Sequence, residues 1–440
     1  MTTLVAALAA WFDAVAVAWH THGGLWWFLM FAPALLFLEL PRYYLPLAWA
    51  ITARLRGADA AQAHAAAIDR ERLLRRRPLV SVVVAGRNEE EIIAASVQSL
   101  LAQDYPHLEI LVVDDHSDDR TSAEVRPFTE DPRVRLVRNA AERGRSGRPS
   151  ASNLGLRLAR GEFLVSLDAD TTFDTKLVSS LLAPFADPRV GVVAGNVLIR
   201  NWRDNLLTRL QALEYAVAID VNKRWCDTRG AVLQASGAVG AFRREALVDV
   251  GGWEQQLGED TDVSLRMLKA GWRLRFAPEA IARTDCPRHL RVVMKQRFRW
   301  DRGGLRAFFK KHGRLLDPRV AGFWFAVELA SEFLFAVVAT LAYPIWLLTL
   351  AWQAPAVAAF VLLVSFAAYS LLSLASVAAV AWCCPRVEKP WSLAGASLLA
   401  PFYKEVLRWV RAWATVCELL RIRYEDTFLP SSAWTYGRRY

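Results

Sequence analysis

The chain is poor in cysteine and histidine for its length. Its 440 residues include five cysteines and seven histidines, and no two cysteines stand in a Cys-x-x-Cys spacing. We therefore expect neither a structural zinc site nor a disulfide framework, and reduced thiols are the default. Only 22% of the residues are charged, which excludes an intrinsically disordered chain and a coiled coil.

Apolar sequence is abundant instead and is concentrated toward the two ends. Hydrophobic residue types make up 54% of the chain. Apolar runs cover residues 4–19 and 25–40, and longer runs at 323–352 and 354–382 could each span a bilayer. A buried hairpin of a soluble protein is the alternative for the first two runs. We expect transmembrane helices within residues 1–55 and 316–440.

The distribution of positive charge predicts how these helices are oriented. No Lys or Arg stands between the first two runs or around Gln353, whereas Arg386 and Lys389 follow the last long run. Positive residues favour the cytoplasmic side, so the middle of the chain is expected in the cytoplasm. Residues 391–420 contain several charges and are compatible with either a short span or a helix in the headgroup region.

The net charge of +10 has a local origin. Five of the eight residues 70–77 are Arg, at the end of a predicted juxtamembrane linker helix over 56–77. Residues 283–319 hold 12 Lys and Arg against three Asp. Because both segments adjoin apolar runs, we expect contact with lipid headgroups and no binding of nucleic acid.

Between the ends, residues 78–315 have the pattern of one α/β domain. Buried, β-branched runs are predicted to form strands at 79–85, 109–113, 134–137, 162–167 and 190–194, and helical stretches are predicted at 90–103, 150–159 and 175–185. Alternation of this kind indicates a mainly parallel sheet covered on both faces. Ligands of such sheets lie beyond the carboxyl ends of the strands.

Acidic pairs follow two of these predicted strands. Asp114 and Asp115 end the second, and Asp168 and Asp170 end the strand at 162–167. Two carboxylates one residue apart could hold Mg²⁺ or Mn²⁺, and through the cation a diphosphate. Helix caps and Asx turns are the alternative for each pair taken alone.

Two further motifs stand later in the domain. Glu259 and Asp260 precede a helical run, where a carboxylate could act as a general base or only complement the helix dipole. Gln296, Arg299 and Trp300 share one helix face, which suits a sugar ring beside a pyrophosphate. A cationic amphipathic helix lying on lipid explains the same residues, and both explanations can hold together.

The ordered set formed by Val-Asp-Asp, Asp-Ala-Asp, Glu-Asp and Gln-x-x-Arg-Trp resembles the membrane-integrated, processive family 2 glycosyltransferases. Among these are the cellulose, hyaluronan, chitooligosaccharide and poly-N-acetylglucosamine synthases. The resemblance implies a Rossmann-like glycosyltransferase A-type domain. It implies that Asp114, Asp115, Arg148, Asp168, Asp170, Gln296 and Arg299 bind a UDP-sugar donor, with metal on Asp168 and Asp170. Catalysis is assigned to Asp260 with Glu259, and acceptor binding to Trp300, Ser236 and Gly237.

The implied reaction is an inverting, metal-dependent transfer that extends a β-linked exopolysaccharide and moves it across the membrane. UDP-N-acetylglucosamine is the first choice of donor and UDP-glucose the second. The implied location is the bacterial inner membrane, with the growing polymer as acceptor and room for a small membrane or periplasmic partner subunit. The alternative is a non-processive transferase acting on a lipid, similar to ceramide glucosyltransferases. The Gly-Glu-Asp motif departs from the Thr-Glu-Asp of cellulose synthases and leaves the sugar open.

Overall fold

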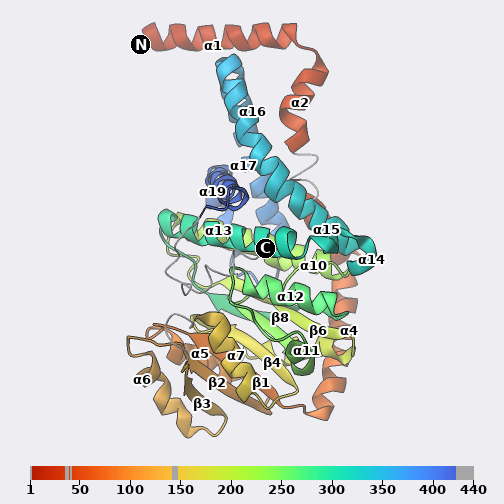
Figure 1. Ribbon diagram of the computed structural model, residues 1–440. Coiled ribbons are helices and arrows are strands. Elements are labelled where there is room, and N and C mark those ends of the chain that lie inside the picture. The colour runs from red at the N-terminus through yellow and green to blue at the C-terminus, as the bar shows by residue number, and fades with distance from the viewer. Residues whose placement is uncertain (1, 35–38, 40–41, 141–146, 423–440) are drawn as a thin grey trace.

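The computed structural model describes residues 2–34, 39, 42–140 and 147–422. Figure 1 shows the sheet and its helices at one end of the molecule and the apolar helices at the other, with α13 and α19 between them. Parts of the two expected membrane regions lie outside the described residues. These parts include most of residues 35–41, which overlap the run at 25–40, and the residues beyond 422. The domain boundaries drawn from sequence stay predictions.

The strands of the described chain form one eight-stranded sheet in the order β3-β2-β1-β4-β7-β6-β8-β5. Neighbouring strands β1–β2, β2–β3, β1–β4 and β6–β8 are parallel, whereas β7 runs antiparallel to β4 and β6, and β5 runs antiparallel to β8. The strands are β1 (Val80–Gly86), β2 (Leu108–Asp114), β3 (Val134–Arg138), β4 (Phe163–Asp168), β5 (Thr171–Phe173), β6 (Val190–Ile199), β7 (Val239–Arg243) and β8 (Arg273–Thr284).

Helices cover both faces of this sheet, as expected. Alternate residues of β1 enter different cores: Val82 and Val84 pack with α5 and α8 on one face, and Val83 packs with α7 and α12 on the other. The helices of the domain are α5 (Ile93–Leu101), α6 (Thr121–Val125), α7 (Arg148–Leu158), α8 (Leu177–Leu182), α9 (Leu206–Tyr215), α10 (Asn222–Asp227), α11 (Arg244–Asp249), α12 (Glu259–Lys269) and α13 (Leu290–Leu305).

The five strands expected from apolar runs are all present, and the α/β class with a mostly parallel sheet is confirmed. The sequence analysis did not predict β5, β7 or β8. The missed strands include every antiparallel pairing of the sheet. In β8, charged residues alternate with buried ones such as Leu274 and Phe276, so that strand lacks a continuous apolar run.

The apolar helices lie on the side of the molecule away from the sheet (Figure 1). Two helical stretches of the described chain are long and apolar enough to cross a membrane: Phe323–Gln353, with 31 residues, and Pro355–Cys383, with 29. The first comprises α15 (Phe323–Phe333), a π-helical segment η8 (Leu334–Ala339) and α16 (Thr340–Gln353); the second is α17. The remaining helices are α1 (Thr2–Thr21), α2 (Gly24–Ala34), α3 (Leu45–Leu55), α4 (Ala58–Arg76), α14 (Pro318–Ala321), α18 (Ala394–Ser397) and α19 (Ala400–Leu419).

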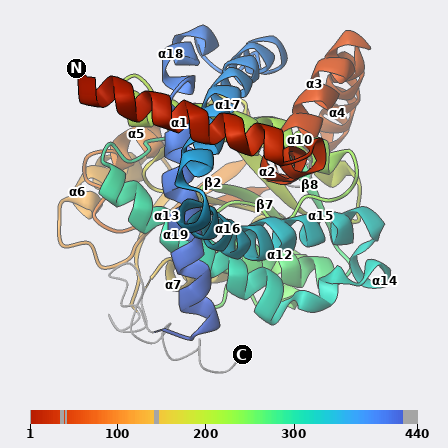
Figure 2. The ribbon, with the colours of Figure 1, turned by 90° about the horizontal axis from the view of Figure 1, so that it is seen from above.

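The ambiguous segment at 391–420 forms mainly α19, which packs on α13 and also contacts α16 and α17. Figures 1 and 2 both show α19 beside α13, on the side of α13 that faces the apolar helices. Arg411 and Glu418 of α19 pair with charged residues of α13, while Trp413 on the same helix stays exposed. Its position therefore agrees with a helix at the boundary between the two regions.

Candidate functional site

The carboxyl ends of β1, β2 and β4 bring two of the predicted acidic motifs to one edge of the sheet. Asp114 pairs in register with Gly86 of β1, and Asp168 pairs with Ala85 on the other side of β1. A Cβ atom on Gly86 would lie 2.3 Å from the Cβ atom of Ala169, between Asp168 and Asp170. Glycine is thus required there so that the chain leaving β1 can lie directly against the Asp-Ala-Asp motif.

Asp114 and Asp115 are both buried and hold the neighbouring loops. The Asp114 carboxylate accepts hydrogen bonds from the Ser117 amide, at 2.8 Å, and from the Ser122 hydroxyl. Burial raises the pKa of Asp114, but these hydrogen bonds outweigh it and keep the pKa below its usual value. Asp115 accepts from the Asn139 side chain and from the Gly147 amide, both at 2.7 Å, which fixes the start of α7.

Arg148, the first residue of α7, connects three parts of the predicted site. Its Nε donates to Oδ1 of Asp168 at 2.7 Å, its Nη1 donates to Oε1 of Glu259 at 3.0 Å, and its Nη2 donates to the carbonyl oxygen of Gly237. The Gly237 amide in turn donates to Oδ2 of Asp260 at 2.8 Å. Five residues singled out from sequence are therefore directly connected, although they come from four separate chain segments.

The cluster carries more negative charge than its arginine offsets. Burial raises the pKa of Asp170 to about 6, with repulsion from Asp168 as the second cause. Burial also raises the pKa of Glu89 to about 8, helped by the charges of Asp170, Asp168 and Asp119. The pKa of Glu259 is raised by burial and then by Asp260, against the attraction of Arg148. A bound cation would relieve this repulsion.

The Asp168 and Asp170 carboxylates suit a divalent cation of the magnesium type. Within the described residues, no group of three or more His, Cys, Asp or Glu side chains forms a ready metal cage. Mg²⁺ commonly uses only one or two protein carboxylates and completes its shell with water and substrate phosphates. Such a site needs only this pair, and the repulsion between Asp168 and Asp170, which adds to burial in raising the pKa of Asp170, supplies the electrostatic reason for binding.

The helix α13 lies next to the start of α12, where Glu259 and Asp260 stand. A Cβ atom on Gly303 would come within 2.9 Å of the Gly258 backbone nitrogen, so the two backbones touch without side chains between them. Trp300 lies one turn before Gly303 and is 43% exposed, with the Arg297 guanidinium 4.6 Å from its ring centroid. Arg299 stands on the same helix.

Two of the predicted ligand-binding side chains carry buried polar atoms without a hydrogen-bond partner among the described residues. These are the Oγ atom of Ser236 and the Oε1 atom of Gln296. A buried polar atom left unpaired is costly, and a partner such as water or a ligand usually satisfies it. Both atoms are therefore candidate contacts for a bound ligand.

Several residues near the cluster escaped the sequence analysis. Glu89 stands four residues after the first predicted strand, so its place in the loop beyond a strand end was an available signal. Arg200 donates from Nη2 to the Asp170 carbonyl oxygen at 3.4 Å. Burial lowers the pKa of Lys223 to about 8, although Asp260 opposes the shift. No local pattern in the sequence marks Arg200 or Lys223.

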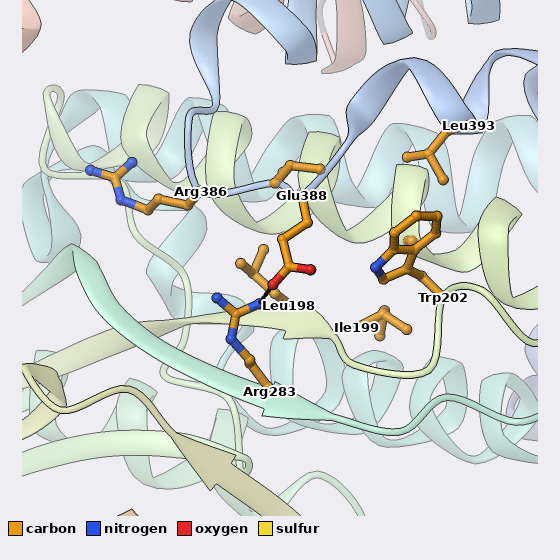
Figure 3. Close-up of a pocket in the computed structure, with 9 residues that line it drawn as sticks. Leu198, Ile199, Trp202, Arg283, Arg386, Glu388 and Leu393 are labelled. Atoms are coloured by element: carbon orange, nitrogen blue, oxygen red, sulfur yellow. Dashed lines mark ion pairs between the residues drawn. The ribbon is translucent and has the colours of Figure 1, made fainter.

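A pocket lies where β6 and β8 meet the segment after α17. Figure 3 shows Arg283 and Glu388 paired at its wall, with Trp202 and Leu393 on the other side. None of the predicted site residues lines it. We therefore place the candidate site at the carboxylate cluster and α13.

The chain is similar to known glycosyltransferases. Residues 77–303 match the family described as "Glycosyltransferase like family 2". Poly-beta-1,6-N-acetyl-D-glucosamine synthase of Staphylococcus epidermidis is 32% identical over 227 residues, which are 51% of this chain and 54% of that protein. The Staphylococcus aureus (strain COL) synthase of the same name is 34% identical over 236 residues, or 52% and 56%. The chain thus spans about half the length of these curated relatives.

A solved structure shares the fold. A mannosyltransferase from Pyrobaculum calidifontis, in complex with GDP-Man and Mn²⁺, covers 86% of this chain and 100% of its own, with a TM-score of 0.52 and 24% identity. The mostly parallel eight-stranded sheet is consistent with the family match over more than half of the chain. This chain belongs to the family 2-like glycosyltransferases.

Proposed function

We propose that this glycosyltransferase is an inverting, processive enzyme that polymerises a UDP-activated sugar into a β-linked exopolysaccharide and passes the product through its apolar helices. UDP-N-acetylglucosamine is the first choice of donor and UDP-glucose the second. The names of the staphylococcal relatives support the first choice. The cluster in which Arg148 joins Asp168, Glu259 and Gly237 carries the proposal, because it places the predicted donor side beside the predicted base.

In this proposal Asp260 is the general base. Its Oδ2 accepts the Gly237 amide, and its Oδ1 accepts the Thr261 amide at 2.7 Å, so the carboxylate is held at the start of α12. It takes the proton of the acceptor hydroxyl as that oxygen bonds to the anomeric carbon and the bond to the UDP oxygen breaks. A single displacement from the far side inverts the anomer, so an α-linked donor gives a β-linkage.

The leaving UDP carries negative charge that the site must stabilise. Arg148 forms ion pairs with Asp168 and Glu259, so its positive charge is already in place when the bond between the anomeric carbon and the UDP oxygen breaks. Asp168 and Asp170 would hold Mg²⁺ or Mn²⁺, which when bound offsets charge on the diphosphate. Gln296 and Arg299 are assigned to the diphosphate, and Trp300, Ser236 and Gly237 to the acceptor sugar.

We further propose that the apolar helices lie in a membrane. The stretches Phe323–Gln353 and Pro355–Cys383 would cross the bilayer with their shared turn outside the cell. Arg386 follows the second and pairs with Glu279 of β8, which keeps that end on the side of the catalytic domain. The arrangement corresponds to a multi-pass bacterial inner-membrane protein with a cytoplasmic catalytic domain.

The test uses the purified full chain in detergent with each radiolabelled UDP-sugar and a divalent cation. We expect products of many sugar units from UDP-N-acetylglucosamine. A single sugar on a lipid would instead support the non-processive alternative, and no transfer from any UDP-sugar would overturn the proposal. Asp260→Asn should still bind UDP while turnover falls about 10²- to 10⁴-fold; unchanged turnover would remove Asp260 as the base.

A further inference from the structure

Trp300 is held by a chain of contacts that begins on α19, more than a hundred residues further along the sequence. The Arg297 guanidinium lies over the indole, 4.6 Å from the ring centroid. Its Nη2 donates to Oε2 of Glu214 on α9 at 2.9 Å. The Tyr403 hydroxyl of α19 donates to the same Glu214 oxygen at 2.8 Å. One carboxylate oxygen thus joins α9, α13 and α19 behind the indole.

Each member of this chain is restrained by its surroundings. The Tyr403 ring is buried against Leu210, Val293 and Ala400, so its hydroxyl has little freedom. Arg297 is mostly buried, and its Nη2 atom is held by the Glu214 carboxylate. The indole of Trp300 is the partly exposed end of this series of contacts, and without them it would be free to change rotamer.

The helix that supplies Tyr403 is itself locked to α13 at two further points. Arg411 donates to Asp301, the residue after Trp300, at 2.9 Å. Glu418 is 4% exposed and accepts from Arg302 at 2.5 Å, from Arg306 at 3.0 Å and from Lys310. Arg302 lies in the last turn of α13, and Arg306 and Lys310 lie in the π-helical segment Arg306–Lys311 that follows it, so a single carboxylate ties the end of α13 and the next turn to α19.

We propose that Tyr403, Glu214 and Arg297 are positioning residues that hold the Trp300 indole for the acceptor sugar, with α19 as the element that anchors them. This rests on the proposed function, in which Trp300 binds the acceptor. A sugar stacks on an aromatic face only where that face is presented at a fixed angle, and a fixed ring loses less entropy on binding. The acceptor subsite therefore depends on a helix outside the 77–303 segment that matches the family.

Tyr403→Phe tests the proposal most cleanly, because it removes one hydroxyl and keeps the buried ring. Glu214→Gln is the second variant and keeps the shape of the carboxylate. Tyr105→Phe is the matched control: Tyr105 is equally buried, and its hydroxyl donates to the Pro78 carbonyl oxygen, away from the carboxylate cluster and α13. Rates of UDP release from UDP-N-acetylglucosamine are measured while an added β-linked N-acetylglucosamine oligosaccharide and the donor are varied in turn.

We expect Tyr403→Phe to raise the KM for the oligosaccharide roughly 3- to 10-fold and to leave the donor KM within about twofold, with a larger effect in Glu214→Gln. Tyr105→Phe should leave both KM values unchanged. A fall in kcat with both KM values unchanged would show a merely structural role and overturn the proposal, as would Tyr403→Phe behaving like the control. If the wild-type chain releases no UDP from any UDP-sugar, the proposed function fails and the positioning role falls with it.

Discussion

The backbone contact between Gly258 and Gly303 gives a sharp test of how closely catalysis depends on the placing of α13. In Gly303→Ala, the new Cβ atom would lie 2.9 Å from the Gly258 nitrogen and 3.1 Å from its Cα atom. Neither neighbour is a flexible side chain, so the start of α12 and α13 must separate by about 0.5 Å or more to restore ordinary contact. Glu259 and Asp260 follow Gly258 directly and would move with it.

The two energy terms of this substitution oppose each other. Alanine within a helix gains about 1 kcal/mol over glycine, whereas overpacking costs about 1–3 kcal/mol. We therefore expect the free energy of unfolding to fall by only about 0–2 kcal/mol. The rate of UDP release should fall more, by about 10- to 100-fold, because misplacing a reacting group by a fraction of an ångström is costly.

The next residue supplies the control. A Cβ atom on Gly304 would meet only the Phe308 ring, at 3.7 Å and 3.8 Å, which is ordinary contact. Gly304→Ala should raise the thermal unfolding midpoint in detergent slightly and keep the rate within about twofold of wild type. Equal rates in the two variants would refute the argument that the α12–α13 contact positions the base.

Three further predictions follow from other contacts. Glu418→Gln leaves three cations without their carboxylate and should cost about 2–4 kcal/mol, measured as a lower unfolding midpoint, whereas Glu71→Gln, at an exposed ion pair with Arg75, should leave the midpoint unchanged. Burial lowers the pKa of His312 below 6.5, and hydrogen bonds from His312 and Lys311 hold the pKa of Asp262 well below 3.8 despite its burial. As the pH falls, the unfolded chain therefore binds protons before the folded chain does, and the free energy of unfolding should fall below about pH 6.5. His312→Asn should flatten the upper part of that decline, and an unfolding midpoint independent of pH between 7 and 5 would contradict the prediction. A chelator should abolish UDP release and added Mn²⁺ or Mg²⁺ should restore it if Asp168 and Asp170 hold a cation; activity that survives chelation would argue against that assignment.

Local patterns in the sequence were enough to predict the parallel part of the fold. The runs that became β1, β2 and β4 are buried on both faces, so nearly every residue in them is apolar. β7 has the sequence Val-Gly-Ala-Phe-Arg, without a β-branched run, and β8 mixes arginines with buried residues, so neither forms such a run. The mixed character of the sheet depends on pairings between distant segments, which no local window contains.

Some parts of the candidate site could likewise be predicted from local sequence, and others could not. Asp114 and Asp168 could be located because a strand end is a local feature, and the register of β1 then brings them together. The link from Arg148 to Glu259 joins residues 111 positions apart, and the bond from Tyr403 to Glu214 joins residues 189 apart. Contacts of this range are set by the tertiary fold, so the positioning chain behind Trp300 could be found only in the structure.

The unpaired Oγ atom of Ser236 bears on which acceptor sugars this enzyme would bind, because Ser236 is assigned to the acceptor. A buried oxygen gains a hydrogen bond when the ligand carries a matching hydroxyl or amide, and lacks that bond when a deoxy analogue binds. A sugar without the matching group loses binding free energy, because it leaves a buried oxygen without a hydrogen bond. This loss discriminates between sugars more strongly than a change in apolar shape does.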